Sequence, residues 1–208
     1  MVDADTLATY VMIVLVFVFI PGPATLLTVA RATSSGAKAG IATGVGIAAG
    51  DIIHTLLAVL GLSAIIATSA LLFSVIKYLG AAYLIYLGIR TLTGGGLPAG
   101  QIKTARVSPS TAFRQAIYSE LLNPKTGLFY LSFLPQFVHA ENGTVFLQLI
   151  ELGLVFVLLG LFSTIIFALS AGVLGSYLRR NPTVVKWQNK VVGVILCSLG
   201  VRLALQEQ

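Results

Sequence analysis

Charged residues are scarce in this 208-residue chain: only 10% of its residues are Asp, Glu, Lys or Arg, whereas 57% are hydrophobic. A soluble domain carries about 25% charged residues. A folded chain with so little charge would expose an apolar surface that water does not solvate. The composition therefore argues against soluble enzymes and soluble binding modules and favours a membrane protein.

Residues that bind metals or carry redox chemistry are also scarce. Cys197 is the single cysteine, so neither an internal disulfide nor a CxxC pair is available, and the two histidines, His54 and His139, are too few and too far apart for a metal site. The sequence contains no GxxxxGK[ST] phosphate loop and no catalytic triad. We therefore expect no cofactor, no metal and no enzymatic activity.

Long apolar runs take the place of the missing charge. Each run is long enough for a helix across the hydrocarbon core, which needs about 20 residues. Asp3 and Asp5 stand where a cleaved signal peptide would be basic, so the first run is expected to be retained. The sequence predicts an all-α polytopic membrane protein with six transmembrane helices in a single domain over residues 1–208. The runs cover about 6–32, 38–66, 70–92, 110–138, 144–176 and 184–205.

Basic residues are distributed unevenly between the ends of these predicted helices. With six spans, one side of the membrane receives ten Lys and Arg, and the other receives only Arg202 beside Asp3, Asp5, Glu141 and Glu207. The positive-inside rule makes the first side cytoplasmic and both termini non-cytoplasmic. The net charge of +6 forms no clustered basic face, so we expect lipid headgroups rather than nucleic acid as partners. The ten residues are Arg31, Lys38, Arg90, Lys103, Arg106, Arg114, Arg179, Arg180, Lys186 and Lys190.

Two of the apolar runs are interrupted at matching places. Pro21-Gly22-Pro23 interrupts the first run and Asn123-Pro124-Lys125 the fourth. Both breaks lie nine residues from an arginine predicted to be cytoplasmic, Arg31 or Arg114. This is about 14 Å along a helix, near the middle of a core about 30 Å thick. Broken helices in corresponding positions of two halves are typical of secondary transporters.

A glycine-rich connection divides the chain into two halves. Residues 94–109 contain Gly94-Gly95-Gly96 and Pro98 and are expected to form a flexible cytoplasmic linker between repeat 1, about 1–93, and repeat 2, about 110–208. Because each half has three helices, the second enters the membrane from the opposite side. This predicts a 3+3 inverted repeat with the first and fourth helices broken at PGP and NPK. The third and sixth helices also share a pattern, Lys77, Gly80, Gly88 and Arg90 against Lys190, Gly193, Gly200 and Arg202.

Each break frees backbone groups inside the membrane. A proline has no N–H for the carbonyl four residues earlier. After each break a new half-helix begins, with Asn123 as a favourable N-cap, and its free N–H groups carry about half a positive charge. We expect the two positive ends, Gly22 to Thr25 and Asn123 to Thr126, to bind a carboxylate, with Lys125 adding a full charge. The carbonyls left needing partners are those of Phe17, Phe19 and Glu120, four residues before Pro21, Pro23 and Pro124.

Asp51 is the most informative acid. It lies 13 residues after Lys38, roughly 20 Å into the membrane, where an aspartate costs about 2.5 to 3.5 kcal/mol. Its predicted role is to hold a solute ammonium or a coupling proton; the alternative is an ion pair with Lys125 or Lys77 that only joins helices.

His54 and Glu120 are secondary candidates. For His54, one turn after Asp51, a packing role is favoured over proton transfer. Glu120, one turn before Pro124, is expected to be either a gate or a member of an ion pair at a helix end.

A ridge of glycines precedes Asp51 in the second predicted helix. Gly36, Gly40 and Gly44 are spaced by four residues, and Gly46 and Gly50 continue the ridge. Such a surface lets another helix approach closely, either inside the chain or in a homo-oligomer.

Several motifs stand out as a set: Ile20-Pro21-Gly22-Pro23, Gly50-Asp51 with His54, Lys77 with Gly80-Ala81-Ala82-Tyr83-Leu84, Asn123-Pro124-Lys125 and Phe133-Leu134-Pro135-Gln136-Phe137. Together they resemble the LysE/RhtB family of bacterial amino-acid exporters, over nearly the whole chain. The resemblance implies proton-driven export of an amino acid or close derivative, such as homoserine, threonine, leucine, lysine or homoserine lactone, across the inner membrane. Family members often carry an acidic or polar residue in the fifth helix, where this chain has Gly160 beside Ser163 and Thr164.

The function expected from the sequence is secondary transport of an amino acid. An ion channel or inorganic-cation carrier would need a ring of oxygen ligands, for which the mid-membrane acids are too few. A non-transporting accessory membrane protein is the other alternative. The expected substrate-binding residues are Pro21, Gly22, Pro23, Thr25, Asp51, Asn123, Pro124 and Lys125, and those for proton coupling or gating are Asp51, His54 and Glu120.

Overall fold

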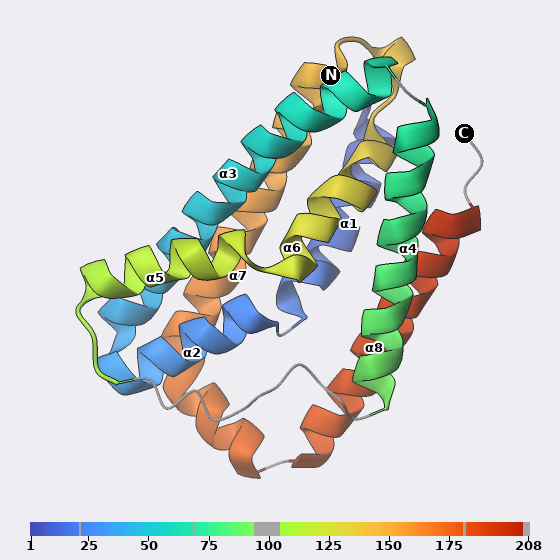
Figure 1. The fold of residues 1–208 in the computed structure, drawn as a ribbon. Helices are drawn as coiled ribbons and strands as arrows, with labels where there is room; N and C mark the ends of the chain where they lie inside the picture. The colour runs from blue at the N-terminus through green and yellow to red at the C-terminus, as the bar shows by residue number, and fades with distance from the viewer. Residues whose placement is uncertain (21, 69, 94–104, 181, 206–208) are drawn as a thin grey trace.

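Figure 1 shows the fold in a computed structural model, which describes residues 1–20, 22–68, 70–93, 105–180 and 182–205. All regular elements in these ranges are helical, as predicted. Their bounds agree with the predicted apolar runs to within a few residues. Pro21 and most of the predicted linker, residues 94–104, lie outside the described residues. The elements are α1 (Ala4–Phe19), α2 (Pro23–Ser35), α3 (Ala37–Thr68), α4 (Ala70–Leu92), α5 (Pro109–Leu121), α6 (Pro124–Leu128), η1 (Phe129–Phe133), η2 (Leu134–Phe137), η3 (Ala140–Asn142), α7 (Val145–Arg180) and α8 (Pro182–Leu205).

Several helix ends are fixed by local sequence. Asp3 caps α1 through a hydrogen bond of 2.9 Å from the Thr6 N–H to Asp3 Oδ1. Ser108 caps α5, with Pro109 in the first turn, where its missing N–H costs nothing. Gly36 separates α2 from α3 with a φ of +89°, a conformation that glycine adopts without steric cost.

By length and composition, two described stretches are long and apolar enough to cross a membrane, Ala37–Gly61 of α3 and Val145–Val173 of α7. α1 and α2 together make a third if counted as one span, bent by 51° at the break. The predicted count of six spans is not reached by this criterion.

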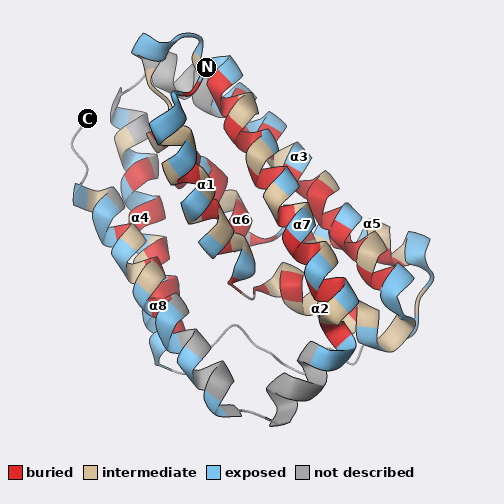
Figure 2. Ribbon diagram, turned by 180° about the vertical axis from the view of Figure 1, so that it is seen from behind, coloured by how far each residue is buried: buried red, intermediate tan, exposed pale blue. Residues whose placement is uncertain are grey.

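The helices form one large group and one pair. α3 packs along both α5 and α7, and α2 packs against α3 and α7. α4 and α8 pack chiefly on each other, at the side of the molecule in Figure 1, and η1 contacts α4. Buried residues line the inner faces of the helices, while exposed residues face outward (Figure 2). α1 and α6 run through the middle of this arrangement and bring the two chain breaks together.

The glycine ridge of α3 is used inside the chain. A Cβ atom built on Gly44 would lie 2.8 Å from Thr164 Oγ1 of α7, and one on Gly50 would lie 2.7 Å from Glu120 Cβ of α5. The contact with α7 is reciprocal, because a Cβ on Gly153 of α7 would lie 2.8 Å from Thr55 Oγ1 of α3. These close approaches hold α3 between its two neighbours.

An aromatic cluster fills the interior between α1, α7 and the segment after α6. Phe129 and Phe133 of η1 pack on Phe17 and Tyr10 of α1 and on Phe156 of α7. The sequence predicts one continuous helix through this region up to residue 138, which is wrong: the α-helix ends at Leu128 and continues as a π-helix and a 3₁₀ turn. The aromatic side chains of η1 are held by packing on α1 and α7, and Pro135, which cannot donate to the carbonyl four residues earlier, lies in the 3₁₀ turn that follows.

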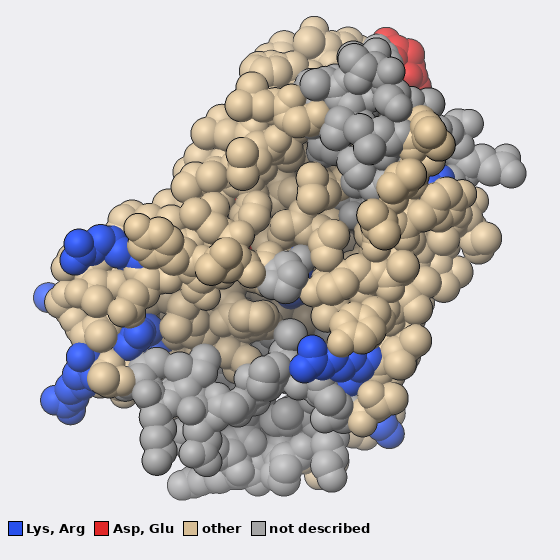
Figure 3. Space-filling view, in the orientation of Figure 1, with Lys and Arg blue, Asp and Glu red and all other residues tan. Residues whose placement is uncertain are grey.

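Charges on the visible surface are segregated. In Figure 3 most Lys and Arg lie toward the end of the molecule where α2 meets α3 and α5 begins, and acidic residues lie at the opposite end. Near the basic end, Arg31 of α2 donates to Gln115 Oε1 of α5 at 2.6 Å and to the Ala105 carbonyl at 3.0 Å. This links α2 to α5 and to the segment before it.

Candidate functional site

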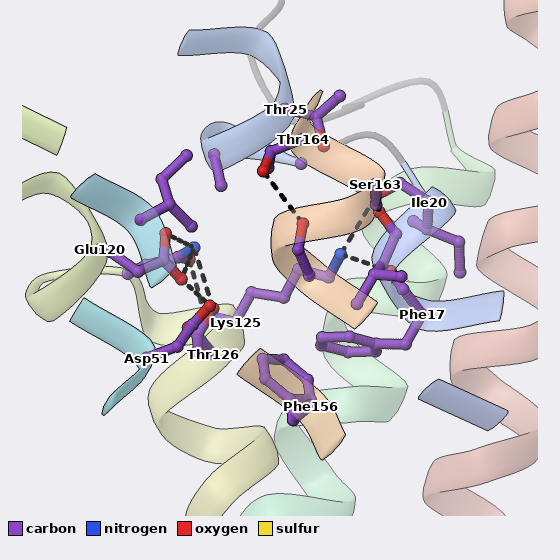
Figure 4. Close-up of a pocket in the computed structure, with 16 residues that line it drawn as sticks. Phe17, Ile20, Thr25, Asp51, Glu120, Lys125, Thr126, Phe156, Ser163 and Thr164 are labelled. Carbon is purple, nitrogen blue, oxygen red and sulfur yellow. Dashed lines mark hydrogen bonds between the residues drawn. The ribbon is translucent and has the colours of Figure 1, made fainter. Parts of the chain in front are cut away.

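A cavity lies where the two broken segments meet (Figure 4). Six helices contribute to it: α1 at its C-terminus, α2 at its N-terminus, α3 and α7 at their middles, and α5 and α6 at their junction. The lining combines apolar side chains with buried polar and charged ones. The lining residues are Phe17, Val18, Ile20, Gly22, Ala24, Thr25, Ile47, Asp51, Glu120, Asn123, Lys125, Thr126, Phe156, Gly160, Ser163 and Thr164.

The carbonyls at the C-terminus of α1 accept hydrogen bonds from side chains. Lys125 Nζ donates to the carbonyls of Phe17 and Ile20, at 3.2 Å each, and lies 4.2 Å from the centroid of the Phe17 ring. Ser163 of α7 donates to the Val18 carbonyl at 2.9 Å. The Phe17 carbonyl therefore has the new partner that the sequence predicts it to need. Lys125 crosses the cavity from α6 to reach it (Figure 4).

The N-terminus of α2 opens into the same cavity without a capping side chain. Gly22 is the N-cap, in extended conformation, and it has no side chain to accept the first N–H groups. Pro23 occupies the first turn, and buried Thr25 and half-buried Ala24 line the cavity. A helix N-terminus of this kind favours an anion through both its N–H groups and its dipole.

Asn123 organises the second break. Its Oδ1 accepts from the Lys125 N–H at 3.1 Å, which makes it the N-cap of α6, as predicted. Its Nδ2 donates to Glu120 Oε1 at 3.1 Å and to Thr126 Oγ1 at 3.1 Å, and the Thr126 hydroxyl in turn donates to Glu120 Oε1. Glu120, 2% exposed, is thus held as an acceptor by neutral donors.

Asp51 is the unsatisfied group of the site. It is 2% exposed, and its Oδ1 has no hydrogen-bond partner among the described residues. Gly160 lies opposite it, since a Cβ atom on Gly160 would be 3.5 Å from Asp51 Oδ2. A buried carboxyl without a partner is costly, so its retention at a cavity wall points to a ligand or a proton.

His54 lies beside the cavity rather than in its lining. Its Nε2 is 3.0 Å from the Glu120 carbonyl, the group expected to need a partner because of Pro124, and its ring stacks on Tyr130 at 5.7 Å. The hydroxyl of Tyr130 also forms a hydrogen bond with the hydroxyl of Thr55 at 3.0 Å. These contacts give His54 a satisfied packing position.

The cavity is small in this conformation. About 40 Å³ is open to the centres of water molecules, which corresponds to a few waters at roughly 10 to 15 Å³ each and is less than an amino acid needs. The side chain of Lys125 occupies part of the space between α1 and α6 (Figure 4).

The structure brings most of the predicted site residues together. The lining includes Gly22, Thr25, Asp51, Asn123, Lys125 and Glu120, whereas Pro23 and Pro124 start helices beside it and Pro21 lies outside the described residues. Sequence reasoning missed the apolar wall of Phe17, Ile20, Ile47 and Phe156, because an apolar residue in an apolar helix gives no signal of its own. Ser163 and Thr164 were noticed only through the family resemblance.

Apolar helices around a cavity that contains the buried charged residues Asp51, Glu120 and Lys125 suit a membrane transport protein as the class. Residues 15–207 match the LysE type translocator family, and the chain belongs to this family. It is 35% identical to the uncharacterized membrane protein YrhP of Bacillus subtilis, over 96% of this chain and 99% of that protein. It is 30% identical to the leucine efflux proteins of Salmonella choleraesuis and Salmonella typhimurium, over 94% of this chain and 93% of theirs. No solved structure matches the chain.

Proposed function

We propose that this chain is a secondary transporter that exports an amino acid, or a close derivative, across the bacterial inner membrane. The observation that carries the proposal is that one cavity contains both the uncapped N-terminus of α2 and the carboxyl of Asp51, whose Oδ1 has no partner among the described residues. The first suits a carboxylate and the second an ammonium group, so the two complement a zwitterion. Family membership and the similarity to leucine efflux proteins support the direction and the substrate class.

In this proposal the solute carboxylate binds the N–H groups of Ala24 and Thr25, with Asn123 and Lys125 on the facing wall. Asp51 holds the solute ammonium or, between export events, the coupling proton. The apolar wall, which includes Phe17, Ile47 and Phe156, contacts the solute side chain. This wall favours a neutral aliphatic side chain, in agreement with the leucine efflux proteins among the relatives.

The proposed architecture is six membrane spans in a 3+3 inverted repeat, with α1–α2 and α5 to η2 as the broken first and fourth spans. Reciprocal contacts support it: Gly44 of α3 meets Thr164 of α7, and Gly153 of α7 meets Thr55 of α3. Gly44 and Thr55 are separated by the same number of residues as Gly153 and Thr164. Such reciprocity is expected when two repeats are related by a two-fold axis in the membrane plane. The proposed orientation places the basic end of the molecule in the cytoplasm and both termini outside.

Two closures separate the cavity from the two sides of the membrane in this proposal. The aromatic cluster around Phe129 and Phe133 lies toward the acidic end of the chain, and the Arg31–Gln115 contact lies toward the basic end. Alternating access then requires that one closure opens while the other stays shut. The small cavity is consistent with a conformation closed at both ends.

Transport by the purified chain in proteoliposomes tests the proposal. We expect labelled leucine and other neutral amino acids to cross the liposome membrane. The rate should rise when a proton gradient is imposed in the direction opposite to amino-acid movement. Inorganic cations serve as the comparison, because a channel or cation carrier would move them instead. An accessory protein would move neither, and a folded protein that moves no amino acid under any gradient would refute the proposal.

Asp51→Asn separates a transport role from a purely structural one. The amide keeps the volume of the carboxyl and removes its charge. We expect transport to fall about tenfold or more, the equivalent of 1.4 kcal/mol or more, while the variant remains folded and monodisperse in detergent. Unchanged transport would remove Asp51 from the proposed site.

A further inference from the structure

The C-terminus of α1 ends inside the protein with carbonyls that the helix itself cannot satisfy. Helices leave their last four carbonyls without internal partners. Here the Val18 carbonyl is satisfied by Ser163 of α7, and those of Phe17 and Ile20 are satisfied by Lys125 of α6. Two of these three bonds therefore depend on one ammonium group from another segment of the chain.

The surroundings of Lys125 Nζ match a primary ammonium group. Two carbonyl oxygens at 3.2 Å accept two of its three N–H groups, and the face of the Phe17 ring lies 4.2 Å below it. The distances are those of hydrogen bonds, longer than the 2.3 to 2.6 Å at which oxygen ligands hold a hard cation such as Ca²⁺. The helix C-terminus adds about half a negative charge.

Among the residues that the structure describes, no carboxylate forms an ion pair with the Lys125 ammonium group. Glu120 is engaged with Asn123 and Thr126, and Asp51 Oδ1 has no hydrogen-bond partner among the described residues. Lys125 is buried, with 9% of the residue exposed, so the positive charge of its ammonium group depends on the carbonyls and the ring for its stabilisation.

We propose that the carbonyl end of α1 is a binding site for a primary ammonium group, and that Lys125 fills this site as a tethered occupant when no solute is bound. The site requires only the Phe17 and Ile20 carbonyls and the Phe17 ring, so it persists when the lysine is removed. It selects an alkylammonium with free N–H groups over a quaternary ammonium, which has none, and over a neutral alcohol of the same size.

The position of the site adds a step to the transport cycle, and this step rests on the proposed function. The Phe17 and Ile20 carbonyls border the cavity, and an amino acid carries the same ammonium chemistry as lysine. When a solute enters, Lys125 exchanges the carbonyls for the solute carboxylate, and the solute ammonium has both Asp51 and the vacated carbonyls within the same cavity. The separation of α6 from the end of α1 is thereby linked to solute binding.

Chemical rescue of Lys125→Ala tests the site directly. This substitution removes the side chain beyond Cβ, three methylenes and an ammonium, which together have the shape of propylammonium. We expect the purified variant to melt several degrees below the wild type, and propylammonium chloride to raise its melting temperature in a saturable way. The wild type, whose site is filled, should not respond.

Matched probes and variants distinguish an ammonium site from general effects. Propanol and tetramethylammonium should leave Lys125→Ala unchanged, and propylammonium should leave Lys38→Ala, which alters an exposed lysine, unchanged. Equal rescue by propanol would indicate that only a cavity was filled and would overturn the proposal, as would an equal response of the wild type.

A second variant covers the case in which Lys125→Ala does not fold. Lys125→Met keeps most of the side-chain volume, and methylammonium is then the probe of the carbonyls. No response of either variant to any primary amine would remove the ammonium site and leave the proposed function standing. If the amines rescue the variants but the wild type transports no amino acid, the ammonium site stands and the proposed function is refuted.

Discussion

Gly160 faces Asp51 across the interface of α3 and α7, close enough that a Cβ atom on Gly160 would lie 3.5 Å from Asp51 Oδ2. A threonine follows each of these residues four positions later. Thr55 donates to the Asp51 carbonyl at 2.9 Å, and Thr164 donates to the Gly160 carbonyl at 3.0 Å. The two helices therefore present equivalent positions to the cavity, one with a carboxyl and one without. A carboxyl on either helix would reach the same space.

The first prediction exchanges these two residues. Asp51→Gly should reduce export about tenfold or more, because a charge-assisted contact worth about 1.5 to 3 kcal/mol is lost. Adding Gly160→Asp should restore a substantial part of the rate, since the carboxyl returns to the same cavity from α7. Initial rates of labelled leucine transport in proteoliposomes measure the effect. A folded double variant that is as inactive as Asp51→Gly would show that the carboxyl must come from α3.

The second prediction concerns the close approach of α3 and α7. Gly44→Ala places a methyl group 2.8 Å from Thr164 Oγ1, so the protein should lose about 1 to 3 kcal/mol of stability from overpacking. Thermal melting in detergent measures this loss, and Thr164→Gly in the same chain should recover part of it. Gly172→Ala is the matched control on α7, because its methyl group would meet no described atom within 4 Å. A loss as large at Gly172 would contradict the packing argument.

The third prediction separates the two roles of Asn123. Asn123→Ala removes both the N-cap of α6 and a donor to Glu120, and should cost about 1 to 2 kcal/mol for the cap alone. Asn123→Asp keeps an acceptor for the Lys125 N–H but places a second carboxylate beside buried Glu120. We expect it to be the less stable of the two by thermal melting. Greater stability of Asn123→Asp would mean that the cap outweighs the contact with Glu120.

The fourth prediction is a pH dependence at the N-terminus of α1. The Thr6 N–H, which donates to the Asp3 carboxylate, holds the pKa of Asp3 below its usual value of 3.8. A group whose pKa is lowered by folding stabilises the protein above its unfolded pKa, and this stabilisation is lost as the pH falls through the folded pKa. The wild type should therefore lose melting temperature relative to Asp3→Asn between about pH 5 and about pH 2. Asn caps the helix without titrating, and parallel melting curves would contradict the prediction.

Much of this fold follows from sequence because the signals are local. Apolar runs predicted most helix bounds, and the prolines with Asn123 predicted the ends of α1 and α5 and the starts of α2 and α6, since a missing N–H and a capping oxygen act within one turn. The same reasoning identified the carbonyls of Phe17 and Glu120 as groups that need partners.

The partners themselves could not be predicted, because they come from other helices. Lys125, which is expected to offer its charge to a solute carboxylate, binds the carbonyls of α1 in this structure, and His54 of α3 satisfies the Glu120 carbonyl. Both contacts depend on how far α6 lies from the end of α1 and how far α3 lies from the end of α5. No local sequence pattern encodes these distances. The π-helix after α6 was missed for a related reason: its aromatic residues are held by packing on α1 and α7.

The contact of α4 with α8 has a mechanical consequence. A Cβ atom on Gly88 would lie 2.8 Å from the Gly193 carbonyl, and one on Gly200 would lie 2.8 Å from the Ala81 carbonyl, so the two backbones touch at two levels. Leu84 and Leu87 of α4 pack with Leu196 of α8 beside these backbone contacts. The two helices should therefore move as one rigid body. When the cavity opens, the structural change should concentrate at the weaker contacts of α4 with α3 and of α8 with α7.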